Sequence, residues 1–148
     1  MTDSNPSDFL HRASSPVQEH AYRSGPRIVA LETVIPHDVM PGLLALRVHT
    51  DAGTVDGVPV IGHGETYYIP TAAAAVIHDF MAPRLLGSDA RAIESHWRFL
   101  YERMTAFGGT GAEMRALSAV DLALWDIAGQ LAKQPVWRLL GGPVRDAV

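Results

Sequence analysis

The stretch TGAEMRALSAVDLALWDIAGQLAKQPVWRLLGG, residues 110–142, decides the fold of this chain. Apolar residues recur in it every three or four positions, so that they form one stripe along a helix. Small alanines and further apolar residues occupy its other sides, and a helix of this kind is normally buried between two layers. We therefore predict one long buried helix. The residues of the stripe are Leu117, Val120, Leu124, Ile127 and Leu131.

The ends of this segment carry their own signals. Thr110 and Glu113 have the spacing of a capping box, in which two side chains satisfy free N–H groups at a helix start. Pro135 fits the first turn of a second, short helix, where a missing N–H has no cost. Gly141 and Gly142 supply the left-handed residue that ends it.

Two motifs connect the segment to a family. SAVDLALWDIAGQ at residues 118–130, followed by PVWRLLGG at residues 135–142, resembles the mandelate racemase/muconate lactonizing branch of the enolase superfamily. In that family the segment joins a small N-terminal α+β capping domain to a (β/α) barrel. A barrel needs about 200 residues at the least, so a chain of 148 residues has no room for it after the cap. The resemblance implies an amino-terminal portion of an enzyme, without the barrel.

The predicted fold class is α+β, a three-stranded antiparallel meander followed by a helical bundle. Apolar residues alternate with Arg47 and His49 in the second strand, as expected of a sheet with one wet face. Gly62 and Gly64 in the third strand indicate a bulge or a close approach of another backbone. The predicted strands are residues 28–36, 43–50 and 60–68. The predicted domains are a flexible leader (1–27), the capping domain (28–109) and linker helices leading to a missing barrel (110–148).

Two more helices are predicted between the sheet and the central segment. Thr71 is the predicted cap of the first, which runs to about Leu86 with a kink or early end at Pro83. Ser88 and Asp89 are the predicted cap of the second, at about residues 90–107. Its predicted wet face carries Glu94, His96, Arg98 and Glu102, and its predicted apolar stripe is Ile93, Trp97, Leu100, Met104 and Phe107.

The resemblance also implies where substrate would be met. Family members place a loop between the first two strands, and another near the third, over the mouth of the barrel. Here these are residues 34–42 and residues 52–59, the latter containing an apparent insertion at residues 54–59. The predicted substrate-binding residues of the first loop are Val34, Ile35, His37 and Met40. His37 either hydrogen-bonds a carboxylate or hydroxyl of a substrate or is a solvated loop histidine.

No catalytic residue and no metal ligand is predicted in this chain. Asp121 and Asp126 lie five residues apart on a helix, about 140° around its axis, so they cannot converge on one ion. We expect each to bond a neighbouring backbone or an arginine. His63 and Glu65 share a strand face, and we favour a structural role for both. The resemblance implies Mg²⁺ in the complete enzyme, held with the catalytic base by the barrel.

Composition excludes several classes of protein. A net charge of −4 gives no basic surface for nucleic acid, and the absence of cysteine excludes disulfides and thiolate chemistry. No membrane span and no secretory signal occurs, so a cytoplasmic protein is expected. His11 and His20 fall in the leader and are expected to be solvated.

The expected function is that of a cap in a Mg²⁺-dependent enzyme that removes a proton next to a carboxylate, as a racemase, cycloisomerase or acid-sugar dehydratase. The chain alone is expected to be inactive, and its expected partner is a barrel domain in the same or a separate chain. An alternative stays open: a stand-alone module that forms homo-oligomers through exposed apolar residues, or one half of a split enzyme. The residues expected to be uncovered without a barrel are Trp137, Leu139 and Leu140.

Overall fold

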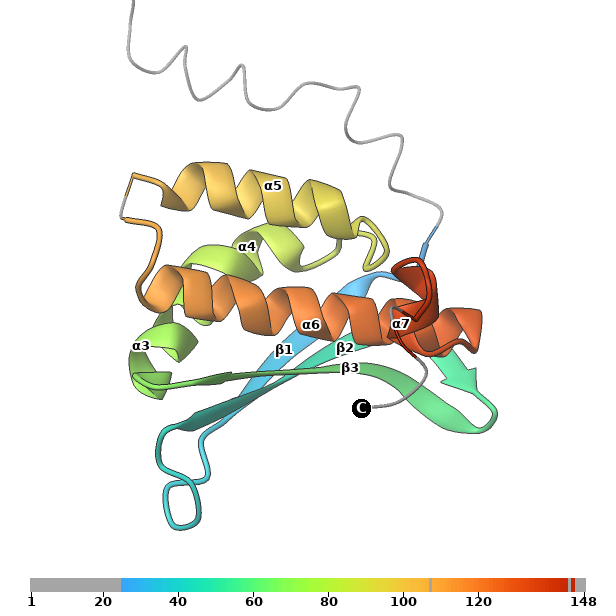
Figure 1. Ribbon diagram of the computed structural model, residues 1–148, viewed down its shortest axis with the longest axis horizontal. Coiled ribbons are helices and arrows are strands. Elements are labelled where there is room, and N and C mark those ends of the chain that lie inside the picture. Colours follow the sequence, from blue (N-terminus) through green and yellow to red (C-terminus); the bar gives the residue numbers. More distant parts are fainter. Residues whose placement is uncertain (1–24, 107, 144, 146–148) are drawn as a thin grey trace, which may run out of the picture.

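A computed structural model describes residues 25–106, 108–143 and 145. It shows a three-stranded sheet with the helices gathered on one of its faces, and α6 crosses this face along its length (Figure 1). The predicted α+β class with an antiparallel meander is confirmed. Leader residues 1–24 lie outside the described residues. Pro26 and Arg27 already belong to the fold, because they bond to the backbone of Ala90 and Asp51.

The strands are β1 (Ile28–Val34), β2 (Leu43–Val55) and β3 (Val58–Tyr67), in the order β1-β2-β3. The prediction that β2 ends before Asp51 was wrong, because the chain turns only at Asp56 and Gly57. Both have positive φ, 52° and 82°, as a two-residue hairpin turn that matches the strand twist requires. Asp51 to Gly53 is instead accommodated as an irregularity in the pairing of β2 with β3.

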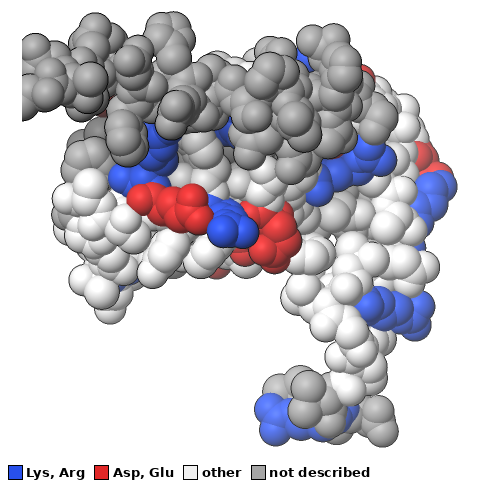
Figure 2. All heavy atoms as spheres, turned by 90° about the horizontal axis from the view of Figure 1, so that it is seen from above, with Lys and Arg blue, Asp and Glu red and all other residues white. Residues whose placement is uncertain are grey.

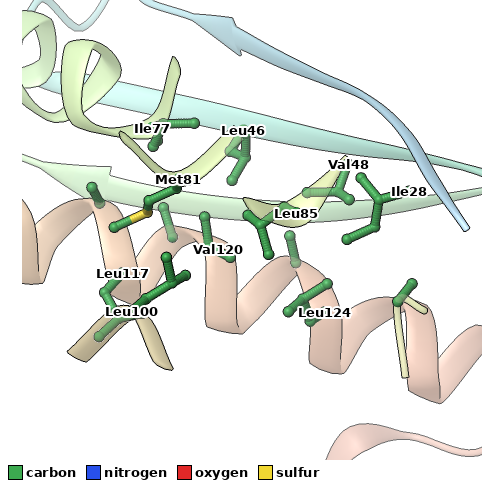
Figure 3. Close-up of a cluster of buried hydrophobic side chains, with 14 of the residues drawn as sticks. Ile28, Leu46, Val48, Ile77, Met81, Leu85, Leu100, Leu117, Val120 and Leu124 are labelled. Atoms are coloured by element: carbon green, nitrogen blue, oxygen red, sulfur yellow. The ribbon is translucent and has the colours of Figure 1, made fainter. Parts of the chain in front are cut away.

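The helix-facing side of the sheet holds the core. Leu44, Leu46 and Val48 of β2 are buried, whereas Arg47 and His49, which alternate with them, point to the other face, as predicted. Figure 3 shows Leu46 and Val48 of β2, with Ile28 of β1, meeting side chains from the helices. The helical contributors labelled there are Ile77, Met81, Leu85, Leu100, Leu117, Val120 and Leu124.

The long helix α6 (Ala112–Ala132) lies directly on β3. A Cβ at Gly64 would overlap the carbonyl oxygen of Ala119, and one at Gly62 would overlap that of Ala123. The pairing of β3 with β2 is regular across both glycines. Of the two predicted roles for these glycines, close backbone approach is therefore confirmed and a bulge is not.

The start of α6 uses only half of the predicted capping box. The Glu113 carboxylate accepts the N–H groups of Thr110 (3.2 Å) and Gly111 (2.9 Å). The cap residue is Gly111, with no side-chain cap bond, so the prediction of a capping hydroxyl from Thr110 was wrong. The anionic form is stabilised by these N–H groups, above all that of Gly111, which lowers the pKa of Glu113.

The other end of α6 leads to the short helix α7 (Val136–Leu139). Lys133 ends α6 in the left-handed conformation, with φ 52°. Pro135 is the residue before α7 and not within its first turn, one position from the prediction. Gly141 and Gly142 follow with φ 111° and 96°, which confirms the predicted stop.

One continuous helical segment joins β3 to the next turn: α3 (Pro70–Ala75), the π-helical turn η1 (Val76–Met81) and α4 (Ala82–Leu85). The predicted cap at Thr71 was wrong, since Pro70 begins the helix and Ile69 precedes it without a side-chain cap. The predicted irregularity near Pro83 takes the form of η1. A wider turn just before a proline accommodates its ring and its missing N–H.

Helix α5 (Ile93–Met104) packs on α6. It starts later than predicted, because Asp89 bonds the N–H of Arg91 (2.8 Å) and so caps a turn instead of the helix. His96 was predicted on the wet face and is only 3% exposed. Trp97, predicted in the apolar stripe, is 37% exposed and stacks on Tyr101. Phe107 lies outside the described residues.

Candidate functional site

The two predicted lid loops lie at opposite ends of the sheet. In an antiparallel meander, consecutive connections alternate between the two ends, and Figure 1 shows the β1–β2 loop and the β2–β3 hairpin tip on opposite sides. Residues 52–59 form the hairpin tip, where Asp56 pairs with Lys133 of α6 at 2.6 Å. The expectation that residues 52–59 share one surface with residues 34–42 was therefore wrong.

The first loop, residues 34–42, is a compact projection closed by its own backbone. The N–H groups of Val39 and Met40 both bond the carbonyl of Pro36, at 3.1 and 2.8 Å. The N–H of Leu43 then bonds the carbonyl of Met40 at 3.0 Å. Two successive tight turns thus present the side chains at the tip.

The predicted substrate-binding residues of this loop differ in exposure. Val34 is 40% and Met40 is 44% exposed, and His37 is exposed as well. Ile35 is half-buried and packs against the core, so that it anchors the loop. Val39, which the sequence did not single out, is 83% exposed at the tip.

The end of β3 meets this loop. The N–H of Tyr68 bonds the carbonyl of Gly42 at 2.8 Å, and a Cβ at Gly42 would lie 2.9 Å from Cζ of Tyr67. The chain then turns through residues 67–70, here named the lid turn, into α3. Tyr68 is 63% and Ile69 is 52% exposed. Sequence reasoning missed this turn, although the alternation of connections in a meander places it at the end that holds residues 34–42.

Together these segments form an exposed, mainly apolar surface at one end of the sheet. We name it the lid surface and define it by Val34, Val39, Met40, Tyr68 and Ile69. An exposed apolar surface on the connections at a sheet end suits contact with a ligand more than it suits stability.

The two aspartates of α6 have different surroundings. Oδ2 of Asp126 accepts the backbone N–H of His63 (2.8 Å) and the side-chain amide of Gln130 (3.0 Å), and lies 3.3 Å from Nδ1 of His63. This confirms the structural role predicted for Asp126 and ties α6 to the outer edge of β3. Asp121 is half-buried, and burial followed by the negative charge of Glu94 raises its pKa.

Charged groups elsewhere pair at the surface. On the open face of the sheet, hydrogen bonds from His49 and then Arg47 lower the pKa of the exposed Glu32 carboxyl. Figure 2 shows basic and acidic residues side by side on the surface seen from above. On α5, Arg98 and Glu102 pair at 2.8 Å. Exposed pairs of this kind are worth little free energy and mark a solvated surface.

Candidate metal-ligating side chains do not cluster among the described residues. Among them no group of three or more His, Asp or Glu side chains comes together in a way that could hold an ion. The described helices also include none long and apolar enough to cross a bilayer.

The comparisons identify the family. Residues 17–141 match the sequence profile described as mandelate racemase / muconate lactonizing enzyme, N-terminal domain. The chain belongs to this family. Its relatives include a D-galactonate dehydratase family member of Streptomyces bingchenggensis, 38% identical over 123 residues, which cover 79% of this chain and 28% of the relative. They also include a D-mannonate dehydratase of Caulobacter sp. strain K31, 43% identical over 95 residues, with 64% and 23% covered.

Solved structures agree with these relatives. An enolase from Pantoea ananatis with bound D-gluconate and Mg has a TM-score of 0.69 at 31% identity, covering 84% of this chain and 29% of its own. An enolase from Sargasso Sea environmental sequence has a TM-score of 0.70 at 43% identity, covering 82% and 31%. The chain spans between 23% and 28% of the length of the two dehydratase relatives named above. It corresponds to the N-terminal domain of such enzymes.

Proposed function

We propose that this chain is the cap of a Mg²⁺-dependent acid-sugar dehydratase and that its lid surface closes the mouth of a barrel active site. The observation that carries the proposal is the convergence of residues 34–42 and the lid turn at one end of a family capping domain. The names of the relatives, D-galactonate and D-mannonate dehydratases, support an aldonic acid as the substrate.

The chemistry divides between two domains in this proposal. Mg²⁺, as in the solved neighbour that holds D-gluconate and Mg, stabilises the charge formed when the proton beside a carboxylate is removed. The described residues of this chain provide no ligand set for it, so no chemical step is assigned to them. The contribution of the cap is to exclude water and shape the mouth of the pocket. We propose that the exposed His37 hydrogen-bonds a substrate hydroxyl or carboxylate.

A second surface is proposed to dock on the barrel. Leu122 on the outer side of α6 is 51% exposed, and Trp137 and Leu140 of the following segment are 47% and 63% exposed. Exposed apolar side chains of this kind are candidates for an interface, and we propose that they contact the barrel. In the alternative, a stand-alone module, the same side chains would join two copies of this chain.

The test uses the polypeptide that carries this sequence, purified from its source. D-mannonate, D-gluconate and D-galactonate are each supplied with Mg²⁺ or with a chelator. We expect Mg²⁺-dependent loss of water from at least one of them, and Val39→Ser with Met40→Ser to raise KM. Leu86→Ser, at an exposed residue outside the lid surface, is the matched control. Absence of dehydration with all three acids would contradict the proposed activity. Fractionation of the source cells tests the cytoplasmic location that we also propose.

A further inference from the structure

The lid turn contains a backbone conformation that its residues disfavour. Tyr68 and Ile69 are consecutive non-glycine residues with positive φ, 66° and 40°. In this region the Cβ of an L-residue crowds its own backbone, and a β-branched residue such as Ile is a clear outlier. Such residues persist only where the surroundings impose them, and they gather at functional sites.

Arg115 of α6 supplies the surroundings. Its Nη1 donates a hydrogen bond to the carbonyl of Tyr67 at 2.6 Å, directly before the two left-handed residues. Its guanidinium also lies 5.0 Å from the ring centroid of Tyr68, within the range of a cation–π contact. One side chain therefore holds both the backbone and the exposed aromatic ring of the turn.

The remaining contacts of the turn transmit this constraint to the first loop. The ring of Tyr68 meets that of Tyr67 edge to face, with centroids 4.8 Å apart. The ring of Tyr67 lies against Gly42, whose carbonyl accepts the N–H of Tyr68. Arg115 thus acts at the junction of α6, the lid turn and residues 34–42.

Among the described residues, no carboxylate draws the Arg115 side chain away from the lid turn. Arg47, Arg91 and Arg98 each pair with a carboxylate there, whereas Arg115 forms no ion pair with any described residue. A planar guanidinium can bond a carbonyl and stack on a ring at the same time, which a lysine ammonium does less well.

We propose that Arg115 is a positioning residue for substrate specificity: it fixes the left-handed lid turn, and so sets where Tyr68 and Ile69 meet the substrate. The kinetic part of this inference rests on the proposed lid function. The structural part concerns this chain alone.

The structural part is tested by NMR on the 148-residue chain. A residue with positive φ gives a strong intraresidue Hα–HN cross-peak in a nuclear Overhauser spectrum. We expect such cross-peaks at Tyr68 and Ile69. Arg115→Met reduces both cross-peaks to the intensity of residues with negative φ, and Arg115→Lys reduces them less. Arg98→Met, which removes an arginine 80% exposed on α5, leaves them unchanged. Ile69→Gly added to Arg115→Met restores the left-handed turn, because glycine adopts positive φ without strain. Intact cross-peaks in Arg115→Met would overturn the inference.

The kinetic part is tested on the source polypeptide with whichever of D-mannonate, D-gluconate and D-galactonate it dehydrates. We expect Arg115→Met to raise KM about tenfold with kcat nearly unchanged, as for loss of a binding contact, and Ile69→Gly to recover part of that loss. Reduced cross-peaks with an unchanged KM would overturn the specificity role alone. If the wild type dehydrates none of the three acids, the lid function fails, and the NMR result still decides whether Arg115 holds the turn.

Discussion

Helix α6 contacts β3 in two ways along the same strand. In the middle, the glycines at positions 62 and 64 let the carbonyls of Ala119 and Ala123 lie against the strand, with no side chain between. At the end of the strand, Arg115 reaches over Tyr67 and Tyr68 and leaves aromatic surface exposed. The first contact is backbone against backbone and tolerates no change in volume. The second depends on one flexible side chain and leaves room for variation. The part of the cap that maintains the fold is thus separate from the part that we propose to meet a ligand.

The largest expected effect on stability comes from adding a side chain where Gly62 and Gly64 of β3 lie against the backbone of α6. Gly64→Val would drive a branched side chain into the carbonyl of Ala119, which cannot move without moving α6. We expect a loss of about 3 kcal/mol or more in the free energy of unfolding. Urea denaturation followed by circular dichroism measures it. Gly109→Ala, where a Cβ meets open space, is the matched control, and an equal loss there would contradict the account.

A smaller effect is expected from the bond that fastens the edge of β3. Asp126→Ala removes the acceptor for the N–H of His63 and for the amide of Gln130. A charged acceptor of this kind contributes about 1–2 kcal/mol, and the same denaturation experiment measures its loss. The exposed ion pair of Arg98 and Glu102 serves as the control for this variant. Glu102→Ala, which removes the partner of Arg98, should change stability by less than about 0.5 kcal/mol. If Asp126→Ala were as stable as the wild type, the packing of α6 against Gly62 and Gly64 alone would hold the helix on β3.

The free energy of unfolding should depend on pH through His96, which is buried and bonds the carbonyl of Asp89 between α4 and α5. Burial, which outweighs its bond to the Asp89 carbonyl, lowers the pKa of His96 from 6.5, with the Arg84 charge acting in the same direction. Below pH 6.5 the unfolded chain therefore takes up a proton that the folded chain resists, so stability present above this pH is lost as the pH falls toward the folded pKa. Unfolding midpoints between about pH 7.5 and pH 5 should decline less steeply in His96→Gln, which keeps a donor for the carbonyl. Parallel declines would contradict this role.

The smallest expected effect on stability concerns the lid turn, at the exposed end of β3. Ile69→Gly relieves a strained residue that is 52% exposed, so the gain from relaxing the backbone opposes a small loss of buried surface. We expect the unfolding midpoint to stay the same or rise, with a change below about 1 kcal/mol. Ala73→Gly, inside α3 and buried, should instead destabilise the protein. A clear loss of stability in Ile69→Gly would mean that the turn is part of the core and not of a lid.

The parts of the fold that depend on local pattern could be predicted from the sequence. The alternation of Leu44, Leu46 and Val48 predicts the buried face of the sheet, and the stripe of α6 predicts its burial, because both follow from the geometry of the backbone. The hairpin tip could not be placed, because residues 51–53 and Asp56-Gly57 are competing turn signals. The second prevails since positive φ at both central positions matches the strand twist.

The errors that concern function have a different cause. His96 falls between apolar positions of α5 and was assigned by its polarity, yet a partner carbonyl at Asp89 makes its burial possible. The lid turn was missed because nothing local favours left-handed Tyr68 and Ile69. Its conformation depends on Arg115, distant in sequence and brought near by the packing of α6 on β3. Val34, Ile35, His37 and Met40 stay predictions as substrate contacts.

The most direct test of the central claim is the mass and activity of the polypeptide that carries this sequence, purified from its source. If the chain is the cap of a dehydratase, the mass is near 40 kDa, as a cap plus a barrel requires, or a chain of 16.0 kDa co-purifies with a separate barrel chain. In either case, Mg²⁺-dependent dehydration of an aldonic acid is expected. A chain of 16.0 kDa that assembles only with itself and dehydrates none of the three acids would contradict the account.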